Sequence, residues 1–188
     1  MGHGGTVVEE LTADHREVEE LFARIEALPP GEEKRKLYAD QVTIELVRHS
    51  IAEEEYLFPA VRAHVPGGGP LADKELADLE GAERLLKDLE GLGAADPAFD
   101  RTLTRLIHEL RSHMSDEEGN LFPRLRDVMP DQELTELGDK VRQAKKTAPT
   151  RPHPHAPSEP PANKLLAPGA GLVDRARDAL TERGREKD

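Results

Sequence analysis

The stretch His49-Ser50-Ile51-Ala52-Glu53-Glu54-Glu55-Tyr56-Leu57-Phe58-Pro59 returns 64 residues later, at 113–123, as His-Met-Ser-Asp-Glu-Glu-Gly-Asn-Leu-Phe-Pro. The two windows share His, two Glu and Leu-Phe-Pro at matching positions. A His four residues before a Glu lies on the same helix face, because four residues advance a helix by about 400°. Two copies of this pair, on two helices of one small domain, predict a metal site inside a helical bundle.

The repeat extends beyond these windows, because residues 13–59 align with residues 77–123 without a gap. The chain is therefore interpreted as a duplicated two-helix unit with pseudo-twofold symmetry. Each unit should supply a His from its first helix, and a His and a Glu from its second. The candidate metal ligands are His15, His49 and Glu53 from the first unit, and His113 and Glu117 from the second. At the position that matches His15, the second unit has Leu79, which cannot bind a metal.

Apolar periodicity predicts four long helices, at about 6–28, 32–64, 71–91 and 98–128. Pro and Gly clusters separate the first from the second and the second from the third. No stretch alternates between polar and apolar residues as a hairpin strand would. The expected fold is all-α, an up-down-up-down four-helix bundle. Pro59 and Pro123 lie inside the second and fourth helices, where each should kink or restart its helix at the same level.

The chain after the fourth helix changes in composition. A short fifth helix is expected at about 131–145, packed on the end of the bundle. Residues 148–168 hold seven of the 15 prolines, which predicts an extended linker and no helix. A weak amphipathic helix is expected at 170–183. The predicted division is a bundle domain, 1–147, and a Pro-rich tail, 148–188. The tail is either a mobile extension or a docking segment for another subunit or protein partner.

Composition excludes several classes of function. The chain has 188 residues and no cysteine, which excludes disulfides, thiolate-bound clusters and cysteine nucleophiles. No run of 18 apolar residues is present, so no membrane span is expected. The first residues lack a basic segment followed by an apolar run, so a secretion signal is not expected, and we expect a cytoplasmic location. Residues 1–147 carry 19 Lys and Arg against 32 Asp and Glu. This acidic surface disfavours nucleic acids as partners and is compatible with metal cations.

His and carboxylates are therefore the only strong metal ligands that the chain offers. In a symmetric site the two Glu residues would bridge two metals and the His residues would complete each coordination shell. An open coordination position would then bind O₂, nitric oxide or peroxide. A single His-x-x-x-Glu pair is common on solvated helices. Two pairs at one repeat spacing, with His15 on a third helix, favour the metal site.

The sequence resembles hemerythrin-like proteins of the His-His-Glu cation-binding class, in the actinobacterial form with a Pro-rich C-terminal extension. The resemblance lies in the motifs Ala13-Asp14-His15, Arg48-His49 to Phe58-Pro59, and His113 to Phe122-Pro123, and in the tail segments that start at Lys145 and Asn163. It implies a non-haem di-iron centre with two irons per chain and an oxo or hydroxo bridge. It also implies a role in binding O₂, in sensing oxygen or iron, or in reacting with peroxide or nitric oxide.

The departure at Leu79 leaves one ligand position to be filled. Glu83, one turn later on the same helix face, is the expected substitute, and water is another. His108 is rotated about 140° from His113 and is expected at the surface. Tyr56 is expected near the metal level as a catalytic residue or a ligand, or as a phenol packed in the bundle. Glu54 and Glu118, 100° from the ligand face, are expected in solvent or hydrogen-bonded to the His ligands.

Three functional hypotheses remain open at this stage. The first is a non-haem iron protein that acts as carrier, sensor or oxidoreductase on peroxide or nitric oxide, with one firmly bound metal and a second, weaker one near His113. The second is a degenerate site in a structural or interaction module. The third is a mononuclear metal protein. The same ligands also accept manganese and zinc, so the ligand set leaves the metal open.

Overall fold

Local sequence signals fix the helix starts. The computed structural model describes residues 3–156, 158 and 160–184, and every regular element in these ranges is a helix. Thr6 Oγ1 accepts the N–H of Glu9 at 3.3 Å, and the Glu9 carboxylate accepts the N–H of Thr6 at 2.8 Å. This capping box satisfies backbone donors at the start of α1 (Val7–Glu26). Asp96 caps α5 (Pro97–Asp116) by accepting the N–H of Ala98 at 2.8 Å.

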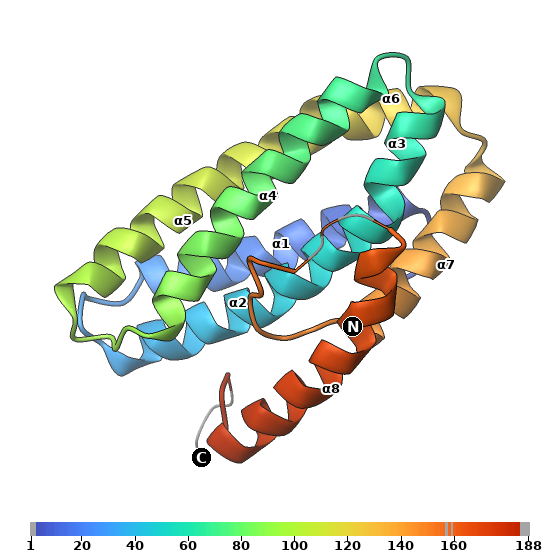
Figure 1. Cartoon of the computed structure of the whole chain (residues 1–188). Helices are drawn as coiled ribbons and strands as arrows, with labels where there is room; N and C mark the ends of the chain where they lie inside the picture. The colour runs from blue at the N-terminus through green and yellow to red at the C-terminus, as the bar shows by residue number, and fades with distance from the viewer. Residues whose placement is uncertain (1–2, 157, 159, 185–188) are drawn as a thin grey trace.

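Four helical arms form an elongated bundle (Figure 1). The first arm is α1. The second is α2 (Glu33–Ala52), continued by α3 (Phe58–His64), the third is α4 (Gly68–Glu90), and the fourth is α5, continued by α6 (Phe122–Val128). Short connections join neighbouring arms, so consecutive arms run antiparallel. The predicted all-α, up-down-up-down bundle is confirmed, and the helix ends differ from the predicted ones by no more than three residues.

A single π-helical turn interrupts each of the two arms that contain an internal proline. These turns are η1 (Glu53–Leu57) and η2 (Glu117–Leu121), and Pro59 and Pro123 follow in the first turns of α3 and α6. Proline has no N–H and its ring clashes with the carbonyl four residues earlier, so a wider turn before it relieves both problems. The expected symmetric irregularity is present, as a pair of π turns. Each π turn begins at a candidate metal ligand, Glu53 or Glu117.

Two apolar clusters fill the bundle, and the candidate ligands lie between them. One cluster surrounds the start of α1 and the helices α3 and α6, and includes Leu11 and Leu79. The other fills the opposite end around Phe22 and Phe99. His15 follows Leu11 of the first cluster and precedes Val18 of the second by one turn each. The polar layer is therefore closed off from solvent by apolar side chains on both sides.

The fifth helix, α7 (Asp131–Thr147), packs against α1 and α2, close to the expected position and length. Among the described residues, no helix combines the length and the apolar character needed to cross a bilayer.

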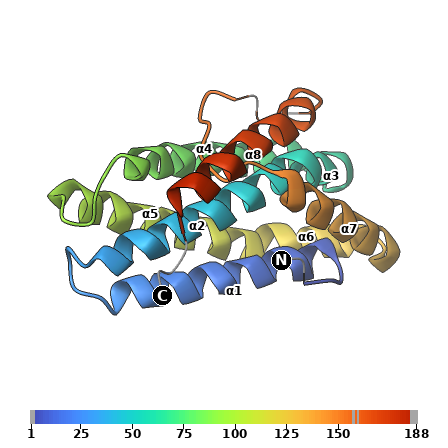
Figure 2. The same ribbon diagram turned by 90° about the horizontal axis from the view of Figure 1, so that it is seen from below.

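The tail contains a longer helix than the sequence predicted. We expected no helix before residue 170, but α8 (Ala162–Thr181) begins at Ala162 and has Pro168 inside it. The proline count misled because six of the seven prolines of 148–168 precede Ala162, which leaves only one within the helix. Figure 2 shows α8 on the outside of the bundle. Arg151 pairs with Asp178 at 2.7 Å and with Glu90 at 3.1 Å, and so ties the tail to α4.

Candidate metal centre

Two groups of metal-capable side chains lie at the boundary between the apolar clusters. In each group every residue offers a donor atom within 4.8 Å of the others'. The first group contains His15, His49, Glu53 and Glu117, and the second contains Glu75, His113 and Glu117. All six residues are at most 5% exposed, and Glu117 belongs to both groups. Among the described residues, the structure therefore brings together all five ligands that the repeat predicted, and adds Glu75 from α4.

The three histidines present the same ring nitrogen to the two glutamates. Nε2 of His49 lies 2.9 Å from Glu53 Oε1, and Nε2 of His15 lies 3.3 Å from Glu117 Oε2. Nε2 of His113 lies 3.7 Å from the same Glu117 oxygen. Three imidazole nitrogens thus converge on two carboxylates, as the ligands of a bundle metal site would.

The other ring nitrogen, Nδ1, of each histidine faces a separate carboxylate. Nδ1 of His49 lies 3.1 Å from Asp14, and Nδ1 of His15 lies 2.8 Å from Glu118. Nδ1 of His113 lies 2.9 Å from Glu75 Oε2. A carboxylate at Nδ1 favours the tautomer with the proton on that nitrogen, which leaves the Nε2 lone pair free for a metal. The expectation that Glu118 bonds to a His ligand is confirmed.

The carboxylates at the centre lie beside imidazole Nε2 atoms without accepting a hydrogen bond from a described residue. Glu53 and Glu117 are fully buried, and in the described structure none of their four oxygens accepts a hydrogen bond. Nε2 of His15 and Nε2 of His113 are likewise buried without a hydrogen bond. A buried carboxylate left in this state costs several kcal/mol, so such groups are paired with cations or bind metals. The donor set therefore fits a metal cation between the two glutamates.

Burial and the neighbouring charges shift the pKa values of the residues at the centre. Burial and the neighbouring charge of Glu117 raise the pKa of Glu53. Burial also favours the neutral form of Glu117, but the charges of His113 and His15 outweigh it and lower the pKa of Glu117 to about 2. Burial disfavours the charged form of His113, but Glu117 and Glu75 outweigh it and raise the pKa of His113 to about 9. Without a metal, protons on His49 and His113 are what offset the carboxylates.

Comparison with known proteins identifies the bundle. Residues 6–125, well over half of the chain, match the hemerythrin HHE cation-binding domain. The chain belongs to this hemerythrin family. The chain is 25% identical over 168 residues to an uncharacterized hemerythrin-like protein of Schizosaccharomyces pombe, which covers 89% of this chain and 82% of that protein.

One solved structure supports the assignment of the hemerythrin fold, and a further relative matches over part of its length. The crystal structure of a hemerythrin HHE cation-binding domain-containing protein from Mycobacterium kansasii superposes with a TM-score of 0.65 at 25% identity, and covers 75% of this chain and 85% of that one. A protein of Nostoc sp. named DNA nickase is 26% identical over 136 residues, or 72% of this chain. The match spans only 38% of that relative's length.

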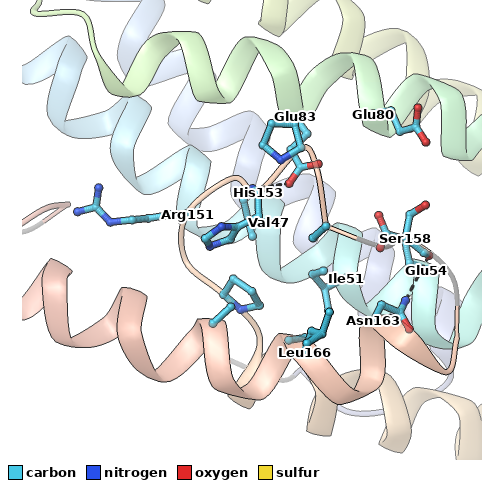
Figure 3. Close-up of a pocket in the computed structure, with 15 residues that line it drawn as sticks. Val47, Ile51, Glu54, Glu80, Glu83, Arg151, His153, Ser158, Asn163 and Leu166 are labelled. Carbon is cyan, nitrogen blue, oxygen red and sulfur yellow. Dashed lines mark hydrogen bonds between the residues drawn. The ribbon is translucent and has the colours of Figure 1, made fainter.

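Within the hemerythrin fold, Leu79 lies in an apolar environment, and Glu83 is not among the described side chains that converge at the centre. Leu79 is buried in the apolar cluster. Glu83 instead accepts the backbone N–H of His153 at 2.8 Å and lines a pocket under the tail, where Figure 3 shows it beside His153. Four-residue steps drift by about 40°, so one turn after Leu79 the side chain faces the tail. One turn before Leu79, Glu75 reaches the centre, and its spacing of four residues from Leu79 is the sequence signal for this position.

Tyr56 also lies elsewhere than expected. Its ring is partly buried against the core and lies 4.0 Å below Lys164 Nζ of α8. The π turn explains the difference, because a wider turn rotates less per residue and moves Tyr56 further from the face of Glu53. Tyr56 therefore contacts the tail helix, and the expectation of a catalytic or ligand role at the metal level is not supported by its position. His108 is exposed, as predicted.

Proposed function

We propose that the protein binds non-haem iron in this centre and that it binds or reacts with O₂, peroxide or nitric oxide. The observation that supports the proposal is the pair of buried carboxylates, Glu53 and Glu117, that accept no hydrogen bond and face three imidazole Nε2 atoms. Iron held by His and carboxylate ligands supplies reversible binding of, or electron exchange with, these small oxidants.

The two donor groups would hold the metals unequally. His15, His49, Glu53 and Glu117 offer four donors to a first ion, and His113 and Glu117 offer two to a second. Glu75 either supports His113 or adds a third donor. Because Leu79 provides no donor, we expect one firmly bound ion and one weaker ion. Glu117 faces both groups and is the residue placed to bridge them.

The test is the metal content and absorption spectrum of the full chain, produced in iron-replete medium. We expect at least one iron per chain and a near-ultraviolet charge-transfer band that changes on addition of O₂, peroxide or nitric oxide. A metal-free, colourless protein that takes up neither iron, manganese nor zinc after reconstitution would overturn the proposal. Uptake of zinc or manganese in preference to iron would overturn the choice of metal and keep the site.

One observation favours a second candidate, a structural or interaction module with a degenerate centre. Leu79 packs an apolar side chain into the core at the position where the repeat predicts a ligand. In that case the metal-free bundle should be as stable as the reconstituted one, which thermal unfolding of both forms decides. The net charge of −12 repels nucleic acid phosphates and so argues against the activity named for the Nostoc relative.

A further inference from the structure

Each carboxylate that supports a histidine of the centre is itself paired with a cation. Lys145 Nζ contacts Asp14 Oδ1, Arg16 contacts Glu118, and Lys74 Nζ lies 3.3 Å from Glu75. Three chains of the form cation, carboxylate, histidine therefore end at the two central glutamates. The cations differ in exposure: the side chain of Lys145 is 8% exposed, and those of Arg16 and Lys74 are 61% and 51% exposed.

Lys145 comes from α7, which lies outside the four arms and outside the region that matches the family domain. A glycine brings α7 close enough: a Cβ atom at Gly138 would lie 2.6 Å from the carbonyl oxygen of Gly5 and 2.9 Å from the backbone nitrogen of Val7. Lys145 follows Gly138 by seven residues, and Asp14 follows Val7 by seven. Seven residues are about two helical turns, so α7 and α1 are again in contact two turns further along, where Lys145 reaches Asp14.

The ammonium group of Lys145 lies in a buried network of charges. It donates to Asp14 and, at 2.9 Å, to Glu10, whose carboxylate also accepts the backbone N–H groups of His3 and Gly4. Asp14 uses its two oxygens separately: Oδ1 accepts from Lys145, and Oδ2 faces Nδ1 of His49. The Asp14 carboxylate thus joins the ammonium group from α7 to the His49 ring, and His3 Nε2 lies 3.6 Å from the same Oδ1.

We infer that Lys145 is a positioning residue of the metal centre, which holds Asp14 against His49 and so aims Nε2 of His49 at Glu53. The inference rests on the proposed metal binding, and it makes α7 a functional part of the site. Supporting partners of metal-binding histidines typically change metal affinity by 10- to 100-fold when removed. Exposed ion pairs contribute at most about 1 kcal/mol, or about five-fold in affinity, so Arg16 and Lys74 should matter much less than Lys145.

The experiment compares matched variants of the full chain. Lys145→Met, Arg16→Met and Lys74→Met each remove one cation, and Glu10→Gln removes the other partner of Lys145 without touching Asp14. Anaerobic competition with a chelator gives the affinity for ferrous iron, and the visible bands of bound Co²⁺ report the ligand field. We expect Lys145→Met to lower affinity 10- to 100-fold and to shift the Co²⁺ bands. The other three should stay within about five-fold, with unchanged bands.

A double variant keeps the test decisive if Lys145→Met does not fold. Lys145→Met with Glu10→Gln removes one positive and one negative charge together, and should show the same loss of affinity. Unchanged affinity and bands in the Lys145 variants would overturn the inference, as would an equal loss in all four single variants, which would indicate general destabilisation. If the wild type binds iron and Lys145→Met binds it equally well, only the inference fails. A wild type that binds no metal overturns both this inference and the proposed function.

Discussion

The two halves of the bundle, residues 13–59 and 77–123, share one sequence pattern but differ around one missing imidazole. In the first half, His15 is present, and its Nδ1 faces Glu118 at the start of the fourth arm's π turn. By the 64-residue offset, the counterpart of Glu118 is Glu54, and the counterpart of His15 is Leu79. Glu54 should thus support a histidine that the chain does not have. Leu79 stands in the place of that histidine.

Glu118 and Glu54 have pKa values that are shifted in opposite directions. Burial would raise the pKa of Glu118, but hydrogen bonds from His15 and Arg16 outweigh it and lower that pKa. Burial and the nearby carboxylate of Glu83 raise the pKa of Glu54 to about 9. A small cavity of about 20 Å³ is lined by Leu79, Glu54 and Glu83. The half with the histidine therefore holds its glutamate at a low pKa, and the half with leucine holds its glutamate at a high one.

The support of the remaining second-half histidine also moved. Asp14 contacts His49 in the first half, and its counterpart Asp78 should contact His113. Instead Asp78 pairs with Lys74 at 3.0 Å near the surface, and the buried Glu75 faces His113. The shift of three residues keeps a carboxylate at Nδ1. Both halves therefore support their second-helix histidine with a carboxylate, but from different positions.

The largest effect that we predict is on iron affinity, and it distinguishes Glu117, which belongs to both donor groups, from Glu53, which belongs to one. Glu117→Gln should lower affinity for iron more than 100-fold and remove both metal equivalents, because Glu117 belongs to both donor groups. Glu53→Gln should remove the firmly bound ion and retain weak binding near His113. Isothermal titration of the metal-free variants measures both stoichiometries. Equal losses in the two variants would show that the halves do not hold separate ions.

The next prediction restores the missing imidazole. Leu79→His should raise bound iron toward two per chain, because the new ring would lie where Glu54 can support it. Without metal, the variant should be about 2–3 kcal/mol less stable, since a polar ring replaces a core leucine. Leu86→His, a buried leucine on the same helix, is the matched control and should lose stability without gaining iron. Elemental analysis after reconstitution decides, and an unchanged iron content would contradict the repeat.

The sequence predicted the fold and five centre residues because both depend on short-range periodicity. Helical spacing places His49 with Glu53 whatever the surroundings, and the 64-residue offset relates His15 to its partners. The choice between Glu75 and Glu83 depended on which way α4 rotates against the tail, and that is a long-range packing result. The contacts of Lys145 with Glu10 and Asp14 join segments more than 100 residues apart, which helical periodicity does not relate. The start of α8 depended on where the prolines lie within 148–168, which a count over the segment averages out. The division at residue 148 stays a prediction.

A third prediction contrasts Glu54 with Glu118 through pH. A carboxyl group with a folded-state pKa of about 9 and an ordinary unfolded value costs stability progressively as pH rises from about 4.5 to 9. Glu54→Gln avoids this cost, so at pH 7 the metal-free variant should be about 1–3 kcal/mol more stable than wild type, with a gain that grows with pH. Glu118→Gln should show no such gain and should weaken iron binding about ten-fold. Urea unfolding between pH 5 and 9 measures the first effect, and a pH-independent difference would refute it.

The smallest effect concerns the aromatic ring beside each π turn. Phe122 stacks on His15 with ring centroids 5.9 Å apart and planes 14° from parallel. Its counterpart Phe58 has Leu79 in the matching position, and among the described residues it stacks on no histidine. Ring pairs of this kind contribute about 0.5–1.5 kcal/mol, so Phe122→Leu should weaken iron binding two- to ten-fold. Phe58→Leu should cost similar unfolding free energy, because both rings are buried, but should leave iron affinity unchanged. In the Leu79→His background, Phe58→Leu should begin to weaken iron binding as well. Chelator competition on Phe122→Leu, Phe58→Leu, Leu79→His and the double variant of Leu79→His with Phe58→Leu would show whether one imidazole accounts for the difference between the two halves.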